Sequence, residues 1–78
     1  MNIIRVKINN QEYEEILAGK KRTVLVKGEE KPKPKDKLML YEWEQEQFTG
    51  RVMHKKVLCV KIHKVNYFIV AFEDEKSI

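Results

Sequence analysis

Three consecutive basic residues, Lys20, Lys21 and Arg22, are the clearest candidates for binding chemistry in this chain of 78 residues. Lysine and arginine side chains contact phosphate oxygens, so the cluster and the adjacent hydroxyl of Thr23 predict a site for a phosphate-bearing partner. The cluster also follows a predicted helix end, where the helix dipole favours cations. Stabilisation of that helix end is therefore an equally good interpretation.

Aromatic residues provide a second kind of candidate contact. Trp43 and Phe48 bracket a polar segment, and an exposed ring beside a basic groove can stack on a nucleic-acid base, which is worth about 1 to 3 kcal/mol per base. Large aromatic residues also dominate small cores, and we expect Tyr41 or Trp43 to be a core residue. Arg51 is a further candidate for a phosphate contact, with an ion pair to Glu42 as the alternative.

Other reactive residue types predict no catalytic or metal site. His54 and His63 are nine residues apart on one predicted strand, which is too far for both to bind one metal ion, and no carboxylate pattern surrounds them. The single cysteine, Cys59, has no neighbouring base and is expected to be a small buried hydrophobic residue. We therefore expect no catalytic residues, no metal and no cofactor.

The charges are arranged in blocks. Residues 20–37 contain eight basic and three acidic side chains, residues 51–65 contain five basic and none acidic, and the whole chain carries a formal charge of +4. If the fold brings the two basic blocks together, they form one positive face that attracts phosphate. Lysines scattered over loops and strands for solubility give the same composition. Only the fold can distinguish a single positive face from dispersed charges.

The hydrophobic pattern predicts five strands and one helix. The helix follows Asn9-Asn10 as candidate N-cap residues, has Tyr13, Ile16 and Leu17 on one face, and ends at Gly19. Gly28–Lys35, with two prolines, and Gln45–Gly50 are expected to be connections, and Glu73–Ile78 a frayed tail. The strands are expected at Ile3–Ile8, Thr23–Val26, Lys37–Glu44, Arg51–His63, with one continuously apolar face, and Tyr67–Phe72, covered on both faces.

Length and composition indicate a single domain, residues 1–78, of the α+β class and mainly β. A chain this short has room for one core, and five short strands with one helix after the first strand most economically curl into a small, partly open β-barrel. No segment reaches the roughly 18 apolar residues of a membrane helix. The N-terminus lacks the apolar core of a secretory signal, so we expect a cytoplasmic protein without membrane contact.

The order of these landmarks resembles the ASCH domains of the PUA-like superfamily, in particular their small bacterial and bacteriophage branch. The resemblance covers about Lys7 to Phe72. It rests on three segments: the helix and its basic end, Glu12–Lys21; the strand with an acidic-aromatic pair, Lys35–Trp43; and the turn before the long strand, Phe48–Arg51. It implies a PUA-like barrel and RNA as the partner class.

The chain departs from the family motif in one place. Gly19 and Lys21 match its Gly-x-Lys, but Val24 and Val26 stand where the family has Glu-x-Arg. Some relatives are amidohydrolases of acetylated cytidine that use a lysine, a threonine and a glutamate; Lys21 and Thr23 match the first two, and the motif glutamate is absent. We therefore expect a non-catalytic RNA-binding module. The alternatives are a phage or mobile-element protein that regulates a host protein, and a residual nucleoside amidohydrolase.

Overall fold

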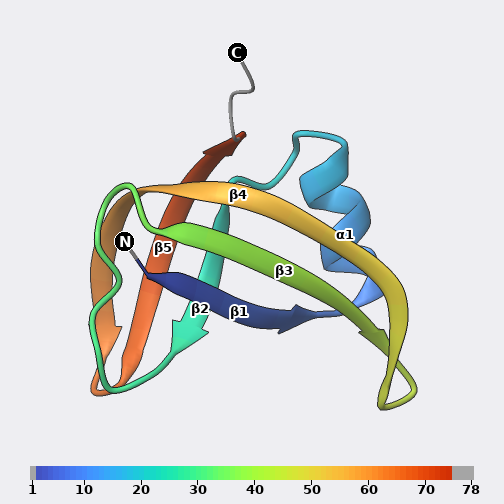
Figure 1. Ribbon diagram of the computed structural model, residues 1–78, viewed down its shortest axis with the longest axis horizontal. Helices are drawn as coiled ribbons and strands as arrows, with labels where there is room; N and C mark the ends of the chain where they lie inside the picture. The colour runs from blue at the N-terminus through green and yellow to red at the C-terminus, as the bar shows by residue number, and fades with distance from the viewer. Residues whose placement is uncertain (1, 75–78) are drawn as a thin grey trace.

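A computed structural model describes residues 2–74 and shows a curled sheet with one helix (Figure 1). The elements are β1 (Ile3–Ile8), α1 (Asn10–Leu17), β2 (Thr23–Lys27), β3 (Lys37–Glu44), β4 (Gln47–Lys64) and β5 (Tyr67–Asp74). β1, β3 and the first part of β4 form the nearer part of the sheet, β5 and β2 form the further part, and the long β4 bends from one part to the other. The expected mainly β, partly open barrel is confirmed.

The five strands form one sheet in the order β1-β3-β4-β5-β2. β1 pairs with β3 in parallel, and the other three pairs are antiparallel. The curl leaves an opening between the edge strands β1 and β2, where Ile3 and Ile4 face Val26 and Lys27 across a hollow of about 380 Å³. Because all five strands within residues 2–74 belong to one sheet, only the outer edges of β1 and β2 lack a partner strand.

Capping residues determine where helix α1 begins and ends. The Asn9 side chain accepts a hydrogen bond from the Glu12 amide at 2.8 Å, and Gly19 adopts a φ of +78° just after the last turn. Both predicted end signals are therefore confirmed. Tyr13 and Ile16 are buried against the sheet, whereas Leu17, expected on the same face, is exposed. Within residues 2–74 no helix is long and apolar enough to cross a membrane.

The core lies inside the curl and is built from alternate strand residues. Leu38 and Leu40 of β3, Val57 of β4 and Val70 of β5 are essentially inaccessible to solvent. β5 was predicted to be covered on both faces, but its burial alternates strictly, since only Phe68, Val70 and Phe72 are buried. Because the sheet is a single curled layer, every strand has one inner and one outer face.

One connection and the C-terminal end of β5 differ from the prediction. β4 begins at Gln47 rather than Arg51, because Gln45 and Glu46 alone make the turn, both with the positive φ of a tight hairpin. The segment 47–50 belongs to the strand, and its first residues pair with the end of β3. At the other end, Glu73 and Asp74 continue β5 instead of fraying. The remaining tail residues, 75–78, lie outside the described residues.

The second half of β4 is irregular, which overturns its predicted continuous apolar face. The pairing with β5 shifts between Val57 and Cys59, so Leu58 enters as an extra residue and is 53% exposed. Cys59 is exposed too, contrary to the expectation of a buried thiol. The bulge resets the alternation, and a strict period of two read from sequence assigns the wrong face beyond it.

The proline-containing loop between β2 and β3 is fixed by Asp36, which is buried. Its carboxylate accepts hydrogen bonds from the amides of Asn2 and Lys33, and its backbone pairs with that of Val57. The Lys35 amide also donates to the Val57 carbonyl at 2.9 Å. The loop is thus attached to β4 and runs beside its bent second half (Figure 1).

Candidate nucleic-acid interface

The predicted cluster at the helix end forms the turn between α1 and β2. The amides of Lys20 and Lys21 donate to the Glu15 carbonyl, and the Arg22 carbonyl accepts from the Phe72 amide. Lys20 and Arg22 are exposed, whereas the Lys21 ammonium is held by the Glu12 carboxylate at 2.5 Å. Lys21 therefore ties the turn after the helix to its first turn, and this ion pair partly satisfies its charge.

A cleft of about 300 Å³ opens beside this turn, between the end of α1 and the end of β5. Lys21, Arg22 and Lys55 line it together with Glu73 and Asp74, so acidic and basic groups are mixed. Lys55 hydrogen-bonds to Asp74, and this contact lowers the pKa of the Asp74 carboxyl below its usual value. The compensated charges make the cleft a weaker site for phosphate than the basic sequence cluster suggests.

Thr23 begins β2 and is exposed, with its inward-facing neighbour Val24 in the core. It pairs with Ala71 of β5 and is not among the residues that line the cleft. Val24 and Val26, which the resemblance to ASCH domains aligns with a Glu and an Arg, are both buried core residues. Polar side chains at these two positions would lie within the packed interior.

Arg51 adopts the second of the two roles considered from sequence, the ion pair with Glu42. Its Nε donates to Oε1 of Glu42 at 2.9 Å and its Nη2 to Oε2 at 2.7 Å, while Nη2 also reaches Glu14 of the helix at 2.7 Å. The guanidinium lies 4.2 Å from the ring centroid of Tyr13. These hydrogen bonds raise the pKa of the Arg51 guanidinium. Two carboxylates and a ring therefore hold the side chain in place.

Glu42 is the centre of this network and is only 3% exposed. Besides Arg51, it accepts hydrogen bonds from the Thr49 hydroxyl at 2.6 Å and the Asn10 amide group at 2.9 Å. The hydrogen bonds from Arg51, then Thr49, then Asn10 lower the pKa of Glu42 to about 2. The sequence indicated Arg51 and Glu42 as a pair, but the roles of Asn10 and Glu14 carry no local sequence signal.

The aromatic residues of the β3–β4 hairpin lie on the outer face of the sheet. Tyr41 and Trp43 are half-buried, and Phe48 is 46% exposed. Their inward-facing neighbours on β3 are Leu40 and the buried Glu42. The expectation that Tyr41 or Trp43 belongs to the core is therefore wrong, because the alternation along β3 assigns the core to the other set of residues.

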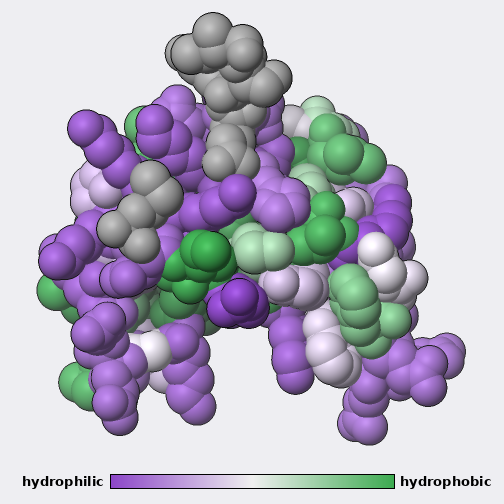
Figure 2. All heavy atoms as spheres, in the orientation of Figure 1, coloured by the Kyte–Doolittle hydropathy of each residue, from purple (hydrophilic) through white to green (hydrophobic). Residues whose placement is uncertain are grey.

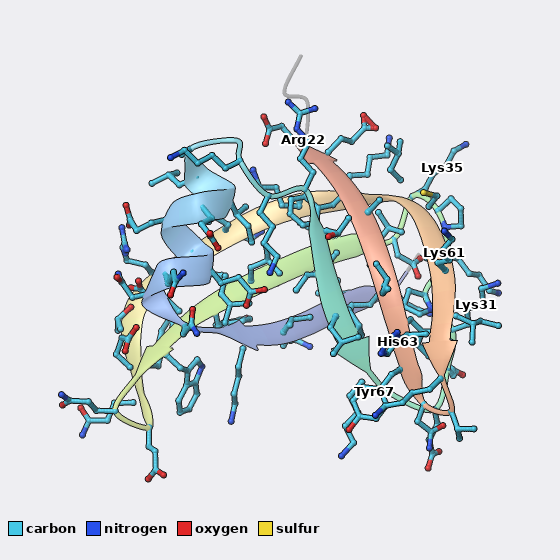
Figure 3. The ribbon with its side chains drawn as sticks, turned by 180° about the vertical axis from the view of Figure 1, so that it is seen from behind. Arg22, Lys31, Lys35, Lys61, His63 and Tyr67 are labelled. Carbon is cyan, nitrogen blue, oxygen red and sulfur yellow. The ribbon has the colours of Figure 1, made fainter. Side chains whose placement is uncertain are left out.

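The fold brings part of each basic sequence block together. The loop that carries Lys31 and Lys35 runs beside the half of β4 that carries Lys61 and His63, and these labelled side chains gather on one side of the molecule (Figure 3). Lys56 is exposed on the same strand, beside the buried Val57, whose carbonyl accepts the hydrogen bond from the Lys35 amide. We call this surface the basic band: Lys31, Lys35, Lys56, Lys61 and His63. Among residues 2–74, none of these side chains makes an ion pair.

The helix-end cluster and the aromatic residues are not brought together. Asn10, in the first turn of α1, contacts Glu42 and Glu44 at the β3–β4 hairpin, whereas the last turn of α1 lines the cleft with the end of β5. The two predicted groups therefore lie at opposite ends of the helix. Across the described part of the chain, no cluster of His, Cys, Asp or Glu is arranged to hold a metal ion.

Comparison with known proteins gives a family without a functional description. A family model described as a domain of unknown function (DUF3850) matches residues 3–73, nearly the whole chain. A search of curated proteins found no match.

Proposed function

This chain belongs to the DUF3850 family, and from that premise we propose that it is a non-catalytic RNA-binding module. The observation that carries the proposal is the basic band, in which lysines far apart in the sequence gather on one surface (Figure 3). Clustered lysines without ion-pair partners bind a polyanion by releasing its condensed counterions. An RNA partner also fits the expected cytoplasmic location.

We further assign the chain to the ASCH domains of the PUA-like superfamily. The order of elements supports this relationship: a helix after the first strand, Gly19 and Lys21 at its end, and a long strand that contains a Thr-Gly-Arg segment near its start. The segment at Thr49 to Arg51 has a structural role here, because it supplies two of the donors to Glu42. Arg51 is therefore not included among the phosphate contacts.

The phosphate contacts are assigned to the basic band, with Lys20 and Arg22 as its extension at the helix end. Four lysines in contact with single-stranded RNA give a slope of log K against log salt of about −3, or roughly a 50-fold loss of affinity between 50 and 200 mM salt. Both values are measured by fluorescence anisotropy with a labelled 12-nucleotide RNA. An affinity that does not change with salt contradicts the assignment.

Two triple alanine variants, with one triple arginine variant as a control, test which cluster contacts the RNA phosphates. Lys31→Ala, Lys35→Ala and Lys61→Ala together are expected to weaken binding at least tenfold at low salt and to reduce the slope by about 2. The same three positions changed to Arg preserve charge and should preserve binding. For comparison, Lys20→Ala, Lys21→Ala and Arg22→Ala are combined in one variant. If the helix end contacts RNA, this variant should bind RNA at least tenfold more weakly. If neither Ala triple weakens binding, both assignments of the phosphate contacts are wrong, and if the wild type does not bind RNA at low salt, the RNA-binding proposal is rejected.

A second candidate, nucleoside amide hydrolysis, is favoured by one observation. The cleft beside the helix end contains both Lys21 and a carboxylate, Glu73, which comes from β5 rather than from the family motif position. Thr23 is not in the lining of the cleft, and Lys21 is already paired with Glu12. Turnover of an acetylated cytidine by the wild-type protein and its loss in Glu73→Gln would favour this activity; no turnover by wild type excludes it.

A further inference from the structure

The outer face of β1, β3 and the first half of β4 carries a second surface with distinct chemistry. Figure 2 views this side and shows white and green spheres over β3 and β4 with purple, hydrophilic spheres around them. The strand register identifies the residues that share this face: Arg5, Lys7, Met39, Tyr41, Trp43, Phe48, Val52 and His54. Each of these residues alternates with an inward-facing neighbour or, at the hairpin, pairs across the turn.

Three rings at the hairpin end of this face form what we call the aromatic platform: Tyr41, Trp43 and Phe48. The ring centroids of Tyr41 and Phe48 are 5.5 Å apart and those of Trp43 and Phe48 are 6.5 Å apart, with tilted planes in both pairs. The Lys7 ammonium lies 4.1 Å from the Trp43 ring centroid. Helix α1 packs on the inner face through Tyr13 and Ile16, so it does not cover these rings, and Phe48 is 46% exposed.

The combination of half-exposed rings and neighbouring cations fits one class of ligand. Unpaired bases stack on aromatic side chains, whereas a duplex keeps its bases stacked on one another and offers mainly its backbone. Because the Lys7 ammonium lies against Trp43, the phosphate of a base bound at this ring has a cation within reach. A second copy of the chain fits less well, because its own basic residues would face Arg5 and Lys7.

We propose that the aromatic platform stacks unpaired bases of a single-stranded nucleic acid whose backbone follows β4 to the basic band. The proposal deepens the RNA-binding function and rests on it. Phe48 and Lys56 lie on the same strand, eight residues apart, which corresponds to a path of roughly 26 Å along β4. His54 lies between them on the outer face. A single strand of several nucleotides can therefore contact both surfaces at once.

Trp43 is the only tryptophan in the chain, so its fluorescence reports on the platform alone. At 50 mM salt we expect a 12-nucleotide uridine RNA to quench Trp43 emission and to protect it from acrylamide. Thymidine DNA of the same length tests whether the ribose hydroxyl matters, and a duplex RNA of the same length tests the need for unpaired bases. We expect quenching by the single strands and little by the duplex.

Phe48→Ala removes one platform ring from an exposed position, with folding checked by circular dichroism. Loss of one stacked base is expected to weaken binding about 5- to 140-fold while leaving the salt slope unchanged, since no phosphate contact is lost. Leu25→Ala is the matched control, because Leu25 is 49% exposed on β2, which pairs with β5 rather than with the strands of the platform. It should leave affinity unchanged.

The outcomes separate this inference from the proposed function. Salt-dependent RNA binding without quenching of Trp43, and with wild-type affinity in Phe48→Ala, overturns the platform but leaves the basic band as an RNA-binding surface. Equal quenching by duplex and single strand overturns the selectivity for unpaired bases. Absence of binding to every nucleic acid overturns both proposals.

Discussion

Arg51 and Glu42 form a two-point ion pair between neighbouring strands, with contacts of 2.9 Å and 2.7 Å. Arg51 stands on β4, Glu42 stands on β3, and Arg51 also contacts Glu14 and the Tyr13 ring of α1. The pair therefore fastens the helix to the sheet at the hairpin end. Because Glu42 is buried and acceptor-only when ionised, the loss of its donors leaves an uncompensated charge in the interior.

The ionised Glu42 makes the fold sensitive to acid. The pKa of Glu42 is about 2, below its ordinary value of 4.5, so the unfolded chain binds this proton at a higher pH than the folded one. The stabilisation is fully present above about pH 5 and is lost as the pH falls from about 4.5 towards 2. Thermal unfolding followed by circular dichroism between pH 7 and pH 2 measures this loss.

Glu42→Gln is the control for the acid prediction, since it keeps the shape of the side chain and removes its charge. We expect a lower melting temperature at pH 7 and a flatter dependence on pH below 4.5. A pH profile that parallels that of the wild type would assign the acid sensitivity to other carboxylates, of which Asp74 is the first to examine because its pKa is also lowered.

Arg51→Lys tests the structural role of the arginine. Lysine keeps the positive charge but has no planar fork to contact both oxygens of Glu42, so the melting temperature should fall at pH 7. RNA affinity of the folded variant should stay at the wild-type level, because the contacts of Arg51 are internal. An unchanged melting temperature together with weaker RNA binding would show that the arginine contacts RNA instead.

Core packing predicts a sharp contrast between two leucines. Leu40 is fully buried and Leu25 is half-exposed. Leu40→Ala should lower the free energy of unfolding by about 2 to 5 kcal/mol through lost burial and a residual cavity. Leu25→Ala should change it by no more than about 0.5 kcal/mol. Urea unfolding of both variants measures the difference, and equal losses would contradict the assignment of the inner and outer faces.

The thiol of Cys59 provides a direct test of the bulge in β4. Cys59 is exposed in the fold, so a thiol reagent such as 5,5′-dithiobis(2-nitrobenzoic acid) should modify one equivalent in the native protein. The rate of thiol modification in the native protein should differ little from the rate in the urea-unfolded protein at the same pH. Protection until the protein unfolds would indicate a regular strand with Cys59 facing inward.

Local signals in the sequence determined the elements and their order. Alternation at Ile4, Val6 and Ile8 predicted β1, and Asn9 with Gly19 marked the ends of α1, because capping and positive φ depend on single residue types. The proline-containing segment was correctly predicted to be a loop, since proline cannot donate in a sheet. The curled, mainly β architecture also followed from five short strands in one small domain.

The tertiary structure alone decided which side of β3 and of the second half of β4 faces the core. Where both faces of a strand carry apolar residues, alternation does not say which one is covered, and the bulge after Val57 and the two-residue turn at Gln45 shift the pattern. For this reason Trp43 and Cys59, both expected inside by residue type, lie outside. The gathering of Lys35 and Lys61 likewise depends on a loop attached to β4 by long-range hydrogen bonds, which no local pattern encodes.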